Sequence, residues 1–219
     1  MSFFSVPDAE TTYLVLIRHG ATEANAARPY RLQGYRTDLP LFDLGRRQAR
    51  EVGRFLATCP LKRVLSSPLR RAVETAEHVA RSHGLRVEPW PDVIECDVGR
   101  WDGMTWARIE REDPEAYRLF MADPATAGYP EGESYRDVQQ RVAPAFEGLL
   151  RESAGTSVAV VSHNVVNRAY LAGLLGVPIS EARRIPQNNG GISLIRRTPA
   201  GTKVLTVNSI LHLEGLDDE

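Results

Sequence analysis

The feature that most constrains the fold is a pair of short apolar segments, each followed closely by a histidine. Tyr13–Ile17 leads into Arg18 and His19, and Ser157–Val161 leads through a serine to His163. Apolar runs of this length without alternation are typical of strands that are buried on both faces of a sheet. Ligands of open α/β sheets bind beyond the carboxyl ends of the strands. Both histidines are therefore expected at one edge of a sheet.

Helical patterns alternate with strand patterns along most of the chain, which predicts an α/β fold of three layers, with helices on both faces of a mostly parallel central sheet. Ser67 is predicted to cap a helix whose first residue is Pro68. Ser134 and Asp137 resemble a capping box, and Pro144 lies inside the helix that follows. The spacing predicts helices over 43–58, 68–83, 113–121, 134–150 and 164–175, and further strands over 63–66, 192–196 and 204–208.

Composition excludes several classes of function. The chain has 27 Lys and Arg against 28 Asp and Glu, so we expect no general attraction to nucleic acid or to an anionic membrane. Cys59 and Cys96 are the only cysteines and do not have the spacing of a zinc site. The first residues lack the pattern of a signal peptide, and no run is long enough to span a bilayer. We therefore expect a cytoplasmic protein without a zinc site at its cysteines.

The 219 residues suit one domain. Residues 1–10 are interpreted as a flexible tail and residues 11–219 as a single domain. The oligomeric state stays open: the apolar segment Val204–Val207 could pair across a homodimer, although an ordinary sheet strand is the simpler interpretation.

Five motifs carry the functional signal, in the order in which they occur. They are Leu16–Asn25 (LIRHGATEAN), Ser66–Ala76 (SSPLRRAVETA), Glu95–Gly103 (ECDVGRWDG), Tyr129–Ser134 (YPEGES) and Val160–His163 (VVSH). Together they resemble the histidine phosphatase superfamily, whose fold is that of phosphoglycerate mutase. The resemblance runs from residue 14 to about residue 175.

The resemblance implies a role for each matching residue. His19 would be the nucleophile that becomes phosphorylated, and Glu95 would protonate the leaving alkoxide and then activate water. His163 would complete the catalytic group and would surround the phosphoryl oxygens together with the arginines. The resemblance implies no metal and no cofactor, because arginines and histidines supply the positive charge. Arg18 and Arg71 would hold the phosphoryl oxygens, supported by Asn25, Gln33 and Asn164. Glu95 is chosen among several nearby acids only by the spacing of the family motif.

The sequence departs from the family pattern at two places. Asn164 stands where many members have glycine, so the pocket would be narrower or would gain a hydrogen bond. The spacing between Asn25 and Gln33 is longer than usual. Arg28 and Arg31 lie in this stretch and could meet a carboxylate or second phosphate of the substrate, although solvated surface arginines are the commoner case.

The resemblance leaves three functions open. A phosphatase acting on small phosphorylated metabolites, of sugar phosphate or phosphoglycerate type, is preferred because the segment 33–45 is similar to the phosphatase branch. A phosphoglycerate mutase-type phosphotransferase shares the first half-reaction. A non-catalytic phosphate-binding domain is disfavoured, because the nucleophile, the acid and the phosphate ligands are all retained. The identity of the phosphate ester cannot be read from these motifs.

Overall fold

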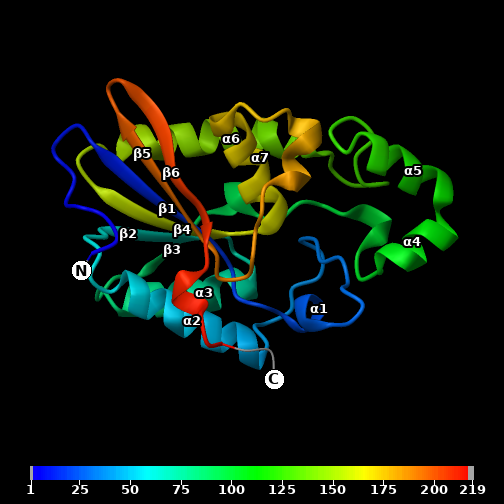
Figure 1. Cartoon of the computed structure of the whole chain (residues 1–219), viewed down its shortest axis with the longest axis horizontal. Coiled ribbons are helices and arrows are strands. Elements are labelled where there is room, and N and C mark those ends of the chain that lie inside the picture. Colours follow the sequence, from blue (N-terminus) through cyan, green and yellow to red (C-terminus); the bar gives the residue numbers. More distant parts are fainter. Residues whose placement is uncertain (1, 217–219) are drawn as a thin grey trace.

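The computed structural model describes residues 2–216, and its centre is a six-stranded sheet with helices on both faces (Figure 1). The strand order is β3-β2-β4-β1-β5-β6. The first four of these are mutually parallel, whereas β5 runs antiparallel to β1 and β6 antiparallel to β5. The prediction of a mostly parallel sheet is confirmed. The strands are β1 (Thr12–Arg18), β2 (Arg63–Ser66), β3 (Val87–Pro89), β4 (Ser157–Ser162), β5 (Ile192–Thr198) and β6 (Gly201–Ser209).

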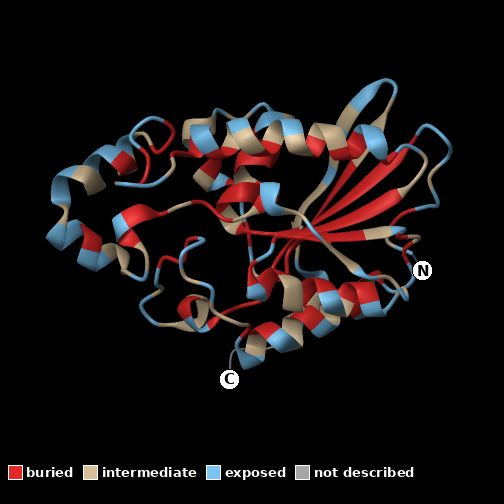
Figure 2. Cartoon of the chain, turned by 180° about the vertical axis from the view of Figure 1, so that it is seen from behind, coloured by how far each residue is buried: buried red, intermediate tan, exposed pale blue. Residues whose placement is uncertain are grey.

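Alternate side chains of β1 enter two separate cores. Leu14 and Leu16 pack with one group of helices, whereas Val15 and Ile17 pack with the other. Figure 2 shows the central strands buried along their length. Helices α6 (Tyr135–Glu152) and α7 (Asn164–Leu175) cover the first face, and α2 (Asp43–Leu56) and α3 (Arg70–Arg81) cover the second. Among residues 2–216, no helix combines the length and apolarity needed to cross a bilayer.

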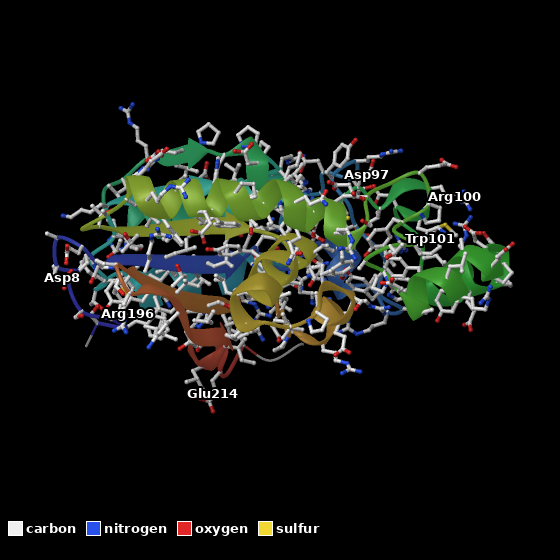
Figure 3. The ribbon with its side chains drawn as sticks, turned by 90° about the horizontal axis from the view of Figure 1, so that it is seen from above. Asp8, Asp97, Arg100, Trp101, Arg196 and Glu214 are labelled. Atoms are coloured by element: carbon white, nitrogen blue, oxygen red, sulfur yellow. The ribbon has the colours of Figure 1, made fainter. Side chains whose placement is uncertain are left out.

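Two short helices form a lobe at one end of the molecule (Figure 1). These are α4 (Trp106–Glu112) and α5 (Pro114–Ala122). A third short helix, α1 (Glu23–Ala26), is separate from the lobe in the sequence and follows β1. Figure 3 shows Arg100 and Trp101 beside this lobe, where both donate hydrogen bonds to the carboxylate of Asp113. The 3-10 segments are η1 (Pro91–Val93), η2 (Gly99–Trp101), η3 (Ile179–Arg184) and η4 (Leu211–Leu213).

Local expectations were met in part. The capping box of Ser134 is present, and α6 continues through Pro144. The prediction that Ser67 caps a helix beginning at Pro68 is wrong, because α3 begins at Arg70 after the N-cap residue Leu69. The segment expected as a flexible tail contains Phe4, which is buried against the ring of Tyr13. Strand β3 and helix α4 were not predicted.

Candidate active site

The pairing of β1 with β4 places the two strand-end histidines side by side. Arg18 and Ser162 are register partners, and the backbone N–H of His19 donates to the carbonyl of Ser162 at 3.1 Å. The rings of His19 and His163 consequently lie with their centroids 5.1 Å apart, inclined at 60°. The expectation that both histidines share one edge of the sheet is confirmed.

His19 is held as a neutral imidazole. Its Nδ1 lies 2.7 Å from the carbonyl oxygen of Gly20, so Nδ1 carries the proton and Nε2 keeps its lone pair. Burial, and then the charges of Arg71 and Arg18, hold the pKa of His19 well below its usual value of 6.5. An imidazole in this state is suited to nucleophilic attack through Nε2.

The loop that carries His19 is tightly packed against helix α2. A side chain at Gly45 would overlap the backbone of Ala21, and one at Gly20 would overlap the backbone of Gly45. Two glycines therefore allow the helix and the loop to touch backbone to backbone. This contact fixes the position of the His19 peptide.

His163 is fully buried and shares a hydrogen bond of 2.7 Å between its Nε2 and the Ser67 hydroxyl. Burial, followed by the charge of Arg71, keeps the pKa of His163 well below 6.5. Its Nδ1 is buried and has no hydrogen-bond partner among the described residues. Nδ1 is therefore free to bond to a bound group.

The two arginines of the site are buried and anchored by backbone carbonyls. Arg18 donates to the carbonyl of Gln187 at 2.5 Å, and Arg71 donates to the carbonyls of Gly34 and Thr37 at 3.1 and 3.0 Å. In both guanidinium groups Nε is buried without a partner within residues 2–216. Because buried N–H groups almost always have an acceptor, these donors indicate the place of an anion.

Glu95 is a buried carboxyl group held by two backbone donors. It accepts from the N–H of Cys96 at 2.9 Å and from the N–H of Asn164, at the start of α7, at 3.1 Å. Burial raises the pKa of Glu95 above 4.5, against the opposing effect of Arg71, Arg18 and Arg141. A raised pKa is what a general acid requires.

The backbone around Glu95 is held by Arg141 and Glu133, which do not line the cavity. Arg141 donates to the carbonyls of Asp92 and Ile94 at 3.0 and 2.9 Å and pairs with the carboxylate of Glu133 at 2.7 Å. Glu133 in turn accepts from the N–H of Asp97 at 2.9 Å. The backbone on either side of Glu95 is therefore bonded to helix α6 and to the loop before it.

The three amide residues predicted for the site differ in whether their polar side-chain atoms already have hydrogen-bond partners. Both polar atoms of the Gln33 side chain are used, one by the Thr22 hydroxyl and one by the carbonyl of Thr37. Oδ1 of Asn25 accepts from the N–H of Thr22, in the capping box of α1, and from the side chain of Asn189. Asn164 has a buried Oδ1 with no partner in the described chain. Asn164 is thus better placed than Gln33 to bond to a ligand.

A cavity of about 200 Å³ brings most of the predicted residues together. Arg71 and His163 are not in its wall and lie fully buried behind it. Neither Arg28 nor Arg31 lines this cavity, and both are exposed. The lining residues predicted from the sequence are Arg18, His19, Asn25, Gln33, Glu95 and Asn164.

Several residues of the site were missed. Ser67 bonds to His163, and Asn189 donates to the His19 carbonyl and to Asn25 at 3.0 and 3.1 Å. Arg168 and Arg183 line the cavity from α7 and η3. The position of Ser67 at the end of β2 was the one available signal, since ligands bind at the carboxyl ends of strands. Within residues 2–216 no group of three or more His, Cys, Asp or Glu side chains could hold a metal ion.

Comparison with protein families gives a match to the histidine phosphatase superfamily (branch 1) over residues 14–210. The chain belongs to the histidine phosphatase superfamily. The resemblance found in the five motifs is thereby confirmed, and so is the phosphoglycerate mutase-like fold.

Individual members of the superfamily are similar over nearly their whole length. Phosphoserine phosphatase 1 of Hydrogenobacter thermophilus is 32% identical over 200 residues, which is 91% of this chain and 93% of that protein. A probable phosphoglycerate mutase, GpmB of Klebsiella pneumoniae, is 30% identical and covers 91% of this chain and 94% of its own length. The solved structure of Bacillus stearothermophilus YhfR is 29% identical, with a TM-score of 0.85 over 93% of this chain and 100% of its own. The superfamily and its phosphatase members identify the chain as a phosphatase that acts on small phosphate esters.

Proposed function

We propose that the protein hydrolyses small phosphorylated metabolites, of sugar phosphate or phosphoglycerate type, through a phosphohistidine on His19. One observation carries the proposal. The neutral imidazole of His19 lies near three buried nitrogens without a hydrogen-bond partner among residues 2–216, namely the Nε–H donors of Arg18 and Arg71 and Nδ1 of His163. Such donors suit the oxygens of a phosphoryl group and stabilise charge that develops on them.

In the first step Nε2 of His19 attacks phosphorus, and the bond from phosphorus to the ester oxygen breaks. Glu95 enters the step protonated, consistent with its raised pKa, and gives its proton to the leaving alkoxide. His19 then carries the phosphoryl group on Nε2, with Nδ1–H still donating to Gly20.

In the second step the Glu95 carboxylate takes a proton from water, and the water oxygen attacks phosphorus. The bond between phosphorus and Nε2 breaks, which releases inorganic phosphate and restores neutral His19. In this scheme Arg18, Arg71 and His163 hold the phosphoryl oxygens through both steps, with Asn25, Gln33 and Asn164 around them. These groups supply the positive charge that a metal ion supplies in other phosphoryl-transfer enzymes.

A mutase differs only in the acceptor, because a second substrate hydroxyl replaces water. The relatives include both a phosphoserine phosphatase and a probable phosphoglycerate mutase. We prefer hydrolysis, because the segment 33–45 is similar to the phosphatase branch.

The proposal also covers the domain organisation of the chain and its compartment. The family match over residues 14–210 supports a single domain over 11–219. Cys59 and Cys96 are both free, which supports a reducing compartment such as the cytoplasm.

The deciding experiment measures phosphate release from a panel of small phosphomonoesters, and isomerisation of 3-phosphoglycerate primed with bisphosphoglycerate. We expect release from several esters by the wild type and by the control variant His78→Ala, which changes a helix histidine outside the site. His19→Ala should lower release at least 1,000-fold. Isomerisation with little release would establish the mutase, and full activity of His19→Ala would refute the phosphohistidine. Inactivity on every substrate would favour the binding domain.

A further inference from the structure

The charge of the cavity exceeds what one phosphate ester requires. Three arginines line it, Arg18, Arg168 and Arg183, and among the described residues Glu95 is the one carboxylic acid in its wall. We propose that Arg168 and Arg183 form a second anion subsite, which binds a carboxylate of the substrate. This inference rests on the proposed phosphatase function and narrows it to phosphorylated carboxylic acids.

Arg183 is held by groups that leave its charge unbalanced. Its guanidinium lies over the rings of Trp106 and Phe120, 5.4 and 5.5 Å from their centroids, and one N–H donates to the sulfur of Met121 at 2.8 Å. Aromatic faces and a thioether orient an arginine without neutralising it. No carboxylate of residues 2–216 pairs with it, whereas the adjacent Arg184 pairs with Glu181.

Arg168 is held in a similar way on helix α7. Its Nε–H donates to the carbonyl of Ile185 at 2.8 Å, and Tyr135 lines the same cavity. Within the described chain it too has no carboxylate partner. It lines the same cavity as Arg18; burial lowers the pKa of Arg18, and the charge of Arg168 lowers it further. The second subsite is therefore directly beside the phosphate subsite.

Charge balance then defines the class of substrate. With Glu95 protonated, Arg18 and Arg71 match a phosphate dianion, which leaves Arg168 and Arg183 to bind the carboxylate. The cavity is small, because its volume of about 200 Å³ is below the ~300 Å³ at which drug-sized pockets begin. The cavity thus fits an acid of about three carbons, with phosphate at one end and carboxylate at the other.

The test compares two substrates that differ only in the group at issue. 3-Phosphoglycerate carries a carboxylate where sn-glycerol 3-phosphate carries a CH₂OH group, and phosphoserine and phosphoethanolamine form a second such pair. The quantity measured is the ratio of kcat/KM within each pair. We expect a ratio above 10 in the wild type, reduced about tenfold to a hundredfold by Arg183→Gln, with partial rescue by Arg183→Lys. Arg184→Gln, the neighbouring exposed arginine, should keep the wild-type ratio.

Failure of the subsite is distinguishable from failure of the function. Phosphate release from both members of a pair with equal kcat/KM would overturn the carboxylate subsite and leave the phosphatase standing. Absence of release from every ester would overturn the function itself. If Arg183→Gln lowers kcat/KM equally for both members, the arginine has no selective role and the proposal fails. Arg168→Gln is the second variant, and an unchanged ratio in both variants would likewise refute the assignment.

Discussion

At His19, burial and two neighbouring charges act on the imidazole together. Burial lowers the pKa of the ring, and the guanidinium groups of Arg71 and Arg18 lower it further, which keeps the ring neutral. The hydrogen bond from Nδ1 to Gly20 sets the tautomer without using a side chain. The backbone of one strand end therefore sets the tautomer of the proposed nucleophile.

Glu95→Gln should separate substrates by the quality of their leaving groups. The variant cannot donate a proton, so kcat/KM for an alkyl phosphate, which reports the transfer to His19, should fall at least 100-fold. For p-nitrophenyl phosphate, whose leaving group needs no proton, kcat/KM should fall less than about tenfold. In the wild type the alkyl rate should fall as pH rises through the raised pKa of Glu95, because its carboxyl loses the proton.

That alkaline limb should be absent from the pH profile of Glu95→Gln. Steady-state kinetics on both substrates from about pH 4 to pH 9 measure both effects. Equal losses on the two esters would assign the acid to another residue.

The site residues that the sequence identified are those that belong to local motifs. His19 and Glu95 could be recognised because each lies in a run of characteristic neighbours. Ser67 could not, because its partner His163 comes from a distant strand, and its use there also explains why it does not cap α3. Arg168 and Arg183 have no motif, and only the folded cavity relates them to His19.

At the scale of elements, strongly periodic segments were predicted well and short ones poorly. Helix α7 was expected over 164–175 and is found as Asn164–Leu175, because a buried strand precedes it and a glycine ends it. Strand β3 has three residues, none of them buried, and exists only through its pairing with β2. Helix α4 ends at Glu112, just before Pro114 begins α5. Its seven residues are too few for a helical pattern of apolar residues to be recognised.

Gly176 ends α7 in the left-handed conformation, with φ 67°. We expect Gly176→Ala to lower the free energy of unfolding by about 1 kcal/mol, because only glycine adopts this conformation without cost. Gly148→Ala is the matched control: it lies within α6, its Cβ would meet nothing, and it should raise stability by about 0.5 to 1 kcal/mol. Urea unfolding of the two variants tests this prediction. A change in the free energy of unfolding with the same sign in both variants would contradict it.

At the scale of the whole molecule, the five histidines act together. Burial lowers the pKa of every one of them below 6.5 in the folded state. As pH falls below about 7, the unfolded chain therefore binds protons that the folded chain does not, and stability is lost. Glu95 opposes this trend, because its raised pKa lets the folded state take up a proton first.

The net effect should be a fall in the free energy of unfolding between about pH 7 and pH 5. Urea unfolding at both pH values measures it, and constant or rising stability towards pH 5 would contradict the prediction. His83→Gln removes one contributor far from the cavity and should reduce the slope.

The order of strands in the sheet has a consequence for the chain as it is synthesised. A ribosome that has delivered residues 1–150 has already made His19, Arg18, Arg71 and Glu95, yet β1 still lacks both of its neighbours, β4 and β5. The carbonyl that anchors Arg18 arrives only with Gln187, and the side-chain amide that donates to the His19 carbonyl arrives with Asn189. Phosphatase activity therefore reports that nearly the whole polypeptide has been made and folded, and an incomplete chain carries a nucleophile that has nothing to hold its substrate.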